Sequence, residues 1–266
     1  MPTIPPRSAL LAAWGGAWLA GEVSLDDAVT HTERHDEAHL VDGLDLDTVP
    51  LERALGRLRA DGVTRLRVVL PAPGDPTGLP GPGPFSTVAL GAGEGVLAIR
   101  DDGTGTGLVP AVTAHGSRLD GTVTTVRWSA HPLPSVPPWS GPFLPDADAD
   151  LRRGVVQVAA ALRDLDVARW RPELADALRD LRATARAGLG EADLPAGYPD
   201  RARDVLVRSR QLAGVLELAG ADAGGAVDTR ETAAREAQLR ELAALVRRAE
   251  IAAWNSYADL LQADSR

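Results

Sequence analysis

The chain has 266 residues, enough for one or two domains, and its net charge of −9 at pH 7 disfavours an extended nucleic-acid surface, because phosphate binding needs a concentrated basic face. All 28 basic residues are arginine, and cysteine is absent. These absences exclude disulfides, thiolate metal sites and thiol nucleophiles, and also lysine Schiff bases and P-loop lysines.

The first element is an apolar stretch, SALLAAWGGAWLAG, at residues 8–21. It is too short to span a bilayer, and Trp18 stands where a signal-peptide cleavage site after Ala20 would need a small residue. Leu10, Trp14 and Trp18 instead recur at helical spacing. We therefore expect a buried amphipathic helix and a cytoplasmic protein that does not associate with membranes.

Short helices and strands are expected next. Ser24, with Asp27 three residues later, is typical of a helix N-cap. The expected elements are a helix at 24–32, a strand at 37–43, a helix at 50–60 and strands at 63–71, 96–100, 108–114 and 122–130. Because a strand, a helix and a strand follow one another from 37 to 71, we expect a right-handed parallel crossover. Alternation in the last segment predicts a sheet with two different faces.

A proline-rich segment, HPLPSVPPWSGPFLPDADAD, then interrupts every pattern at residues 131–150, where six prolines predict a linker or an extended strap. Beyond it, apolar residues recur every three and four positions in segments that begin near Leu151, Leu174, Pro199 and Asp228. Turns containing glycine or proline join these segments, which indicates an antiparallel bundle.

The predicted fold class is therefore α+β, with an N-terminal mixed-sheet domain followed by a C-terminal antiparallel helical bundle. The predicted boundaries are 1–130 for the mixed-sheet domain, 131–147 for the strap and 148–266 for a four-helix bundle-like domain.

Three histidines stand four residues apart in HTERHDEAH, at His31, His35 and His39. On an unbroken helix two neighbours could bind one zinc ion, but the third would lie about 12 Å from the first at a rise of 1.5 Å per residue. The apolar run that follows favours a strand, which would break the helix near Arg34 and scatter the rings. Solvated or capping histidines are the preferred interpretation, and a metal site at His31 and His35 is the alternative.

The loop PAPGDPTGLPGPGPF, at residues 71–85, follows a predicted strand, and open α/β sheets place ligands at the carboxyl ends of parallel strands. Its prolines remove the backbone donors that a phosphate cradle needs. A stiff connecting loop is therefore preferred over a lid or a partner-docking ridge. The candidate partner or ligand contacts are Asp75, Leu79, Phe85, Trp139 and Phe143.

Two further motifs have simple structural interpretations. GAGEG, at 91–95, does not match GxGxxG and predicts a turn. DADAD, at 146–150, lacks the glycine and final glutamate of a calcium loop and favours the start of a helix.

The segments RVVLPAPGDPTGLPGPGPF (67–85) and WRPELADALRDLR (170–182), together with the closing helix, resemble an uncharacterised group of hypothetical proteins from high-GC actinobacteria over most of the chain. The resemblance implies this architecture and no particular chemistry.

The function predicted from the sequence is non-enzymatic binding, to a protein partner or to a second copy of the chain. No catalytic residue and no cofactor is expected. The alternatives are a metal-dependent hydrolase that uses zinc at His31 and His35, and a small-molecule-binding protein that uses the loop at 71–85.

Overall fold

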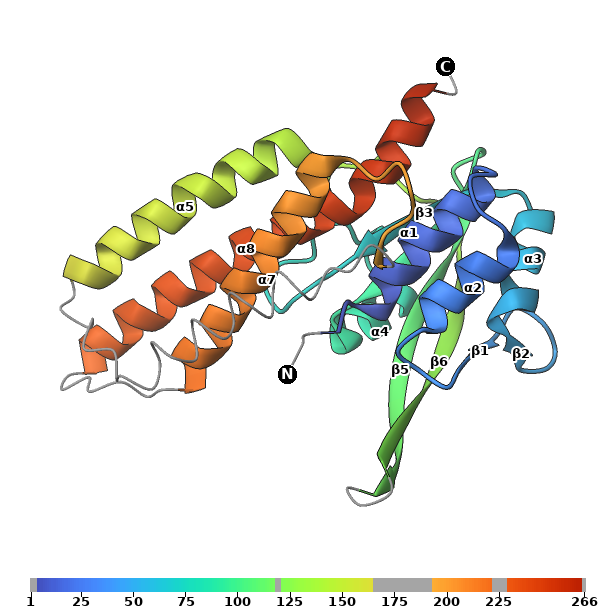
Figure 1. Cartoon of the computed structure of the whole chain (residues 1–266), viewed down its shortest axis with the longest axis horizontal. Coiled ribbons are helices and arrows are strands. Elements are labelled where there is room, and N and C mark those ends of the chain that lie inside the picture. Colours follow the sequence, from blue (N-terminus) through green and yellow to red (C-terminus); the bar gives the residue numbers. More distant parts are fainter. Residues whose placement is uncertain (1–3, 118–120, 165–192, 222–228, 265–266) are drawn as a thin grey trace. The chain divides into compact units, whose positions relative to one another are not determined.

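The computed structural model describes residues 4–117, 121–164, 193–221 and 229–264, which fall into two compact units. The sheet unit comprises Ile4–Gly141, Glu191–Tyr198 and Tyr257–Arg266, and the helical unit lies within Pro142–Gly190 and Pro199–Ser256. A mixed sheet in the N-terminal part and helices in the C-terminal part confirm the predicted α+β class (Figure 1).

The sheet unit is built on one six-stranded sheet with the order β2-β1-β6-β5-β4-β3. The strands are β1 (Ala38–Asp42), β2 (Val49–Pro50), β3 (Val63–Val69), β4 (Gly95–Arg100), β5 (Gly105–Ser117) and β6 (Gly121–Leu133). β1 pairs with β6 in parallel, and every other neighbouring pair is antiparallel. The predicted strands are all present, and β5 and β6 extend beyond their predicted ends.

The predicted parallel crossover is wrong. β3 lies at the opposite edge of the sheet from β2 and β1, and the antiparallel series β6, β5, β4, β3 makes it run opposite to β1. Short turns close the β4–β5 and β5–β6 hairpins at a small entropic cost, and β3 pairs with β4 through a longer connection that contains α4. The loop at 71–85 therefore does not follow a strand of a parallel pair.

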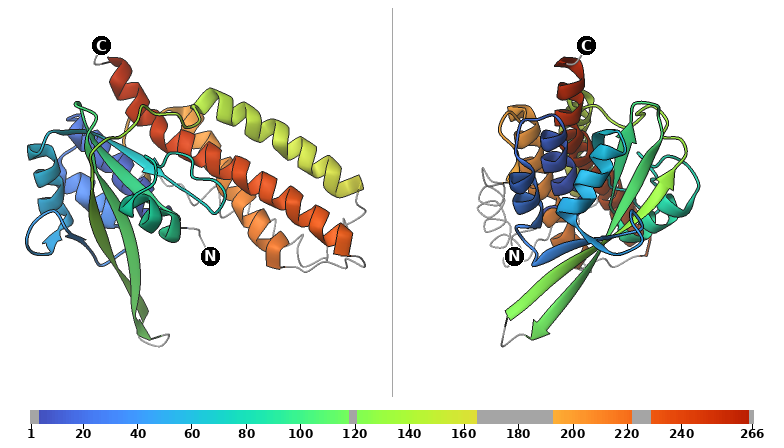
Figure 2. Two further views of the ribbon diagram at one scale, coloured as in Figure 1. Left: turned by 180° about the vertical axis from the view of Figure 1, so that it is seen from behind. Right: turned by 90° about the vertical axis from the view of Figure 1, so that its right-hand side faces the viewer.

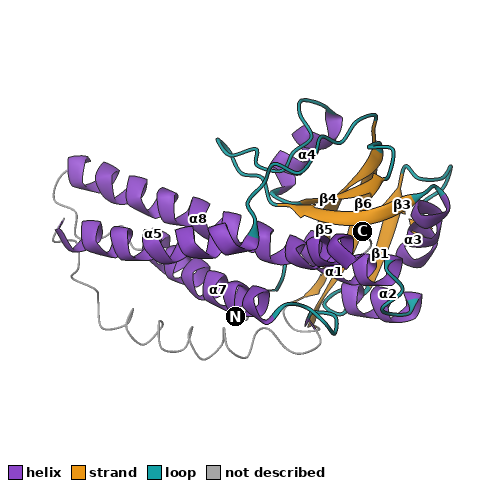
Figure 3. Cartoon of the chain, turned by 90° about the horizontal axis from the view of Figure 1, so that it is seen from above, coloured by secondary structure: helices purple, strands orange, loops and turns teal. Residues whose placement is uncertain are grey.

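Helices cover both faces of this sheet (Figure 3). The helices of the sheet unit are α1 (Arg7–Leu19), α2 (Leu25–Glu33), α3 (Leu51–Ala60) and α4 (Pro84–Ala92). α1 packs on β3 and β4 with Leu10, Trp14 and Trp18 buried, as predicted. α4 packs on the other face, where Phe85 and Ala89 contact a cluster formed by Val69, Leu97, Ile99, Val109 and Leu133.

The helical unit contains α5 (Leu144–Asp164), α7 (Asp200–Ala221) and α8 (Thr229–Asp264), of which α8 passes into the sheet unit at Tyr257. The buried carboxylate of Asp148 on α5 accepts hydrogen bonds from Arg152 on the same helix and from Arg201 and Arg208 on α7. The early part of α8 meets the late part of α7 where Arg235 donates to the carbonyl of Ala219, so these two helices run antiparallel. The helix predicted near Leu174 lies outside the described residues.

The strap between β6 and α5 spans residues 134–143, because β6 continues to Leu133 and α5 begins at Leu144. The predicted start of the strap at 131 lies within β6, where His131 and Pro132 pair with Gly107 and Thr106. Among the described helices, none combines the length and the apolar character needed to cross a membrane.

Candidate functional site

The three predicted histidines have three different environments. α2 ends at Glu33, so the expected break in the helix near Arg34 is confirmed. His31, on α2, stacks on Trp14 with ring centroids 3.8 Å apart and planes 8° apart. His35 lies in the following turn with its Nε2 atom 3.9 Å from Asp193 Oδ1, and burial and the charge of Arg34 lower the pKa of its imidazole.

His39 lies on β1 and belongs to a buried polar network. The indole N–H of Trp128 donates to its Nδ1 atom at 3.3 Å, so Nε2 carries the hydrogen and donates to Asp36 at 3.1 Å. Arg7 donates to both oxygens of Asp36, and Thr124 donates to one of them. Although burial opposes its ionisation, these hydrogen bonds hold the pKa of Asp36 well below its ordinary value. The network therefore joins α1, β1 and β6 without leaving a buried polar group unpaired.

No group of three His, Cys, Asp or Glu side chains could hold a metal ion within residues 4–117, 121–164, 193–221 and 229–264. Metal binding by the pair His31 and His35 stays a prediction.

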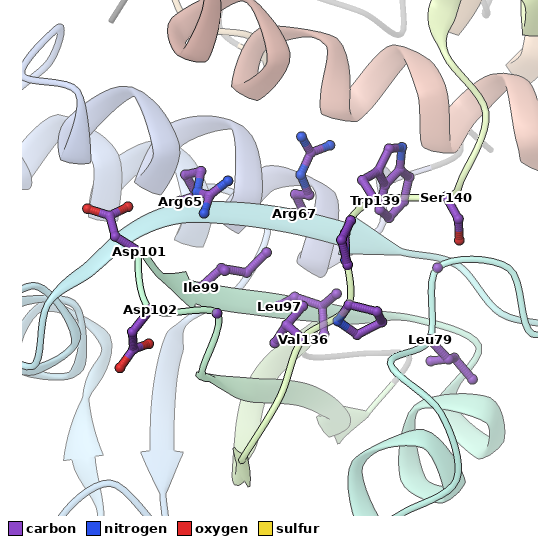
Figure 4. A pocket seen from close by; sticks show the side chains of 14 residues that line it. Arg65, Arg67, Leu79, Leu97, Ile99, Asp101, Asp102, Val136, Trp139 and Ser140 are labelled. Atoms are coloured by element: carbon purple, nitrogen blue, oxygen red, sulfur yellow. The ribbon is translucent and has the colours of Figure 1, made fainter. Parts of the chain in front are cut away.

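A pocket with a volume of about 560 Å³ opens on the face of the sheet that carries α4 (Figure 4). Its walls come from β3, β4, the turn after β4, the loop at 71–85 and the strap. The lining residues are Arg65, Arg67, Gly78, Leu79, Leu97, Ile99, Asp101, Asp102, Gly103, Val136, Pro137, Pro138, Trp139 and Ser140. The pocket lies within the sheet unit.

Arg67 is the most unusual residue of this lining, because its side chain is charged and yet the residue is only 5% exposed. Period-two alternation on β3 directs Arg65, Arg67 and Val69 to the α4 face, while Leu66 packs beneath α1. Nη2 of Arg67 donates to Asp259 at 2.5 Å. Nη1 is buried, and no acceptor among the described residues lies within hydrogen-bonding distance of it.

Trp139 forms the wall of the pocket next to Arg67, whose guanidinium carbon lies 5.1 Å from the centre of the indole. Two glycines hold this ring. A Cβ atom on Gly78 would lie 3.2 Å from the ring, and one on Gly141 would overlap with it. The indole N–H is buried and has no partner in the described part of the chain. The cation–π contact with Arg67 and the close approach of the two glycines therefore fix the indole in one position.

The remainder of the lining separates apolar and acidic groups. Leu97, Ile99 and Val136 provide the apolar surface, whereas Asp101 and Asp102 lie at the opposite end from Trp139 (Figure 4). Both acids are fixed by local hydrogen bonds, Asp101 from Thr64 and Asp102 from Thr104. Hydrogen bonds from Thr104 lower the pKa of Asp102, so this end of the pocket is negatively charged at neutral pH.

The structure brings together two of the five predicted contact residues, since Leu79 and Trp139 both line the pocket. Asp75 instead accepts hydrogen bonds from Thr77 within its own turn. Phe85, in the first turn of α4, is buried in the core between α4 and the sheet. Phe143 is 51% exposed in the helical unit. Whether any of them contacts a ligand or partner stays a prediction.

The two arginines of β3 were not predicted as site residues. Their signal is present in RLRVV, at residues 65–69, where two arginines alternate with aliphatic residues within β3. A long cation at a core-facing position of a buried strand indicates either an ion pair or a ligand.

Residues 8–141 match the family model described as Rv1486c-like protein, N-terminal domain, and residues 145–251 match the model described as Rv1486c-like protein, C-terminal domain. The chain is 28% identical over 288 residues to "Uncharacterized protein ML1804" of Mycobacterium leprae (strain TN), an alignment that covers 94% of this chain and 96% of that protein. These matches confirm the expected resemblance to an uncharacterised actinobacterial group. No solved structure matches the chain.

Proposed function

The chain belongs to the Rv1486c-like protein family, and we propose that its sheet unit binds a small organic anion in the pocket between β3 and the strap. One observation carries the proposal: Arg67 and Trp139, which line the same pocket, each have a buried N–H group without a partner among the described residues. Buried donors in native proteins are nearly always paired, so two unmatched donors on residues that line one pocket support a ligand that supplies acceptors.

The charge of the ligand follows from the chemistry of these donors. Guanidinium and indole N–H groups can donate and cannot accept, and the guanidinium keeps its positive charge at every physiological pH. Asp259 satisfies one nitrogen of Arg67. An oxygen of a carboxylate, sulfonate or phosphate would satisfy another and would offset part of the cost of burying the cation.

The shape of the ligand follows from the rest of the lining. Leu97, Ile99 and Val136 favour an apolar body, and Asp101 and Asp102 disfavour a second negative charge at the far end. A volume of about 560 Å³ is within the range of small-molecule sites. The ligand class is therefore an amphipathic monoanion, with its head near Arg67 and its apolar part over β4.

The test uses 8-anilinonaphthalene-1-sulfonate, a fluorescent monoanion with an apolar body. We expect saturable binding that a medium-chain fatty acid displaces and the corresponding alcohol does not. Arg67→Met should weaken binding at least about tenfold, because a hydrogen bond to a charged group contributes roughly 1.5–3 kcal/mol.

Arg127→Met is the matched control, since Arg127 is exposed on β6, pairs with Asp42 and does not line the pocket. Circular dichroism would first confirm that both variants are folded. Equal affinity of the Arg67→Met variant and the wild type, or displacement by the acid and the alcohol alike, would contradict the proposal.

A further inference from the structure

The hairpin of β5 and β6 continues beyond the rest of the sheet (Figures 1 and 2). The register of β5 with β4 ends at Leu108, whereas its register with β6 continues without a break to Ser117. Residues 111–116 are exposed, and no other described element pairs with β5 along this stretch. One edge of β5 is therefore open beyond Leu108.

The backbone hydrogen bonds of the preceding turn show which groups face that edge. The N–H of Arg100 donates to the carbonyl of Thr104, so even-numbered residues of β5 point their backbone groups toward β4 and odd-numbered residues point theirs toward β6. The same alternation places the N–H and C=O groups of Val112, Ala114 and Gly116 on the open edge. Pro110, which lacks an N–H, lies on the same side at the inner end of the stretch.

This edge lacks most features that keep natural edge strands apart. Such strands are usually short, bulged or charged, and proline or a covering element often blocks them. Here the register with β6 is regular, and residues 105–117 contain no Asp, Glu, Lys or Arg in a chain of net charge −9. Val112 on this segment is 46% exposed. Pro110 blocks only the part of the edge next to β4.

We propose that the open edge of β5 pairs with the same edge of a second copy of the chain, antiparallel about a twofold axis. In that arrangement Ala114 faces Ala114 of the other copy, and Val112 faces Gly116, so the backbone groups of each strand satisfy those of the other. An uncharged segment lets two acidic chains approach without local repulsion, whereas it offers nothing to select a charged peptide. The lack of charge therefore favours a second copy as the occupant.

The absence of cysteine permits a direct test by cross-linking. Cα atoms in a hydrogen-bonded antiparallel pair are about 5.5 Å apart, within the roughly 4.4–6.8 Å that a disulfide spans. We expect the single-cysteine variant Ala114→Cys to form a covalent dimer under mild oxidation. Val123→Cys, exposed on β6 away from this edge, is the control and should remain monomeric. Equal cross-linking of both variants would overturn the proposal.

Light scattering with size-exclusion chromatography provides the second measurement. Wild-type chain should show a dimer whose fraction rises with concentration, and Ala114→Pro should remain monomeric because it removes a donor from the paired edge. Proline is already accommodated on this side of β5 at position 110. A wild type that is monomeric at every concentration, or a folded Ala114→Pro variant that still dimerises, would overturn the proposal. If Ala114→Pro does not fold, the cross-linking of Ala114→Cys compared with Val123→Cys tests the proposal.

Discussion

The position of the Trp139 indole depends on two glycines, Gly78 and Gly141, that lie against the ring. Because a Cβ atom at Gly141 would overlap with the indole, we predict that Gly141→Ala displaces the ring from the pocket wall. Overpacking of this kind costs about 1–3 kcal/mol of unfolding free energy, and loss of the indole donor should also weaken binding of the fluorescent sulfonate. Urea unfolding and the binding titration measure the two effects. Gly91→Ala, which places a Cβ in open space on α4, should leave binding unchanged and should not destabilise the chain, because alanine favours a helix over glycine.

Glu250 lies on α8 in the helical unit. Burial raises the pKa of Glu250 from 4.5 to about 7, although the charges of Arg210 and Arg247 oppose the shift. A raised carboxyl pKa stabilises the folded state below pH 4.5, and this contribution is lost as pH rises through 7. We predict that Glu250→Gln stabilises the chain by about 2 kcal/mol at pH 8 and has little effect at pH 4.5.

Chemical denaturation at the two pH values checks this prediction. Glu241→Gln, an exposed change on the same helix, is the control. An equal gain from Glu250→Gln at both pH values would show that packing of the amide, rather than ionisation of the acid, is responsible.

Individual residues show where the sequence is informative and where it is not. The end of α2 near Arg34 could be predicted from the sequence, because an apolar run with strand character follows it closely in the chain. The partner of His39 was not readable, since Trp128 is 89 positions away and only the pairing of β1 with β6 brings them together. Arg67 likewise finds its carboxylate partner 192 positions away, at Asp259.

At the scale of elements, α1 begins without a capping side chain of its own, because the residue at its N-cap is Pro6. The carboxylate of Glu94 accepts hydrogen bonds from the backbone N–H and the hydroxyl of Ser8, at 2.9 and 2.6 Å. It therefore supplies the acceptor and the negative charge that a helix N-terminus favours. We predict that Glu94→Ala costs about 1–2 kcal/mol of unfolding free energy.

Thermal and urea unfolding of Glu94→Ala test the cap. Glu37→Ala, which removes an exposed carboxylate from the same unit, should shift the transition much less. Equal shifts would indicate a general effect of charge instead of a local effect on α1.

The limits of prediction differ between elements for physical reasons. The N-cap at Ser24 and the turn at GAGEG were readable because their signals are local, and the structure confirms both. Most of β5 and β6 was predicted, but 105–107 and 115–117 of β5 and 131–133 of β6 were not, because glycine, histidine and proline in these stretches do not mark a strand. The parallel crossover failed for a different reason: the order of elements along the chain does not determine which strands become neighbours.

The two units should respond differently to pH between 5.5 and 8. In the sheet unit, hydrogen bonds lower the pKa of Asp36, and burial lowers that of His35. A group with a lowered pKa stabilises the folded state at high pH, and this contribution is lost as pH falls. The loss begins below about pH 6.5 for His35 and below about pH 4 for Asp36. In the helical unit, hydrogen bonds from arginines lower the pKa of Asp148 although burial opposes this, so Asp148 also loses its stabilising contribution as pH falls. The raised pKa of Glu250 has the opposite effect, because its contribution to stability is lost as pH rises.

We therefore predict that raising the pH from 5.5 to 8 destabilises the helical unit and leaves the sheet unit unchanged or more stable. Hydrogen–deuterium exchange, resolved into peptides from each unit, measures the two responses separately. Parallel changes in both units would contradict the assignment of the pH dependence to these four groups.

The sheet unit is not continuous along the chain. The indole of Trp14 donates to the carbonyl of Asp193, whose carboxylate pairs with Arg34, and Asp259 pairs with Arg67. A nascent chain that has emerged from the ribosome only as far as Gly141 has made every strand but lacks these anchors. Domains usually fold in the order of synthesis, but this unit can complete its structure only after residue 259 has been translated. Until then, the contacts of Trp14, Arg34 and Arg67 with these later residues cannot form.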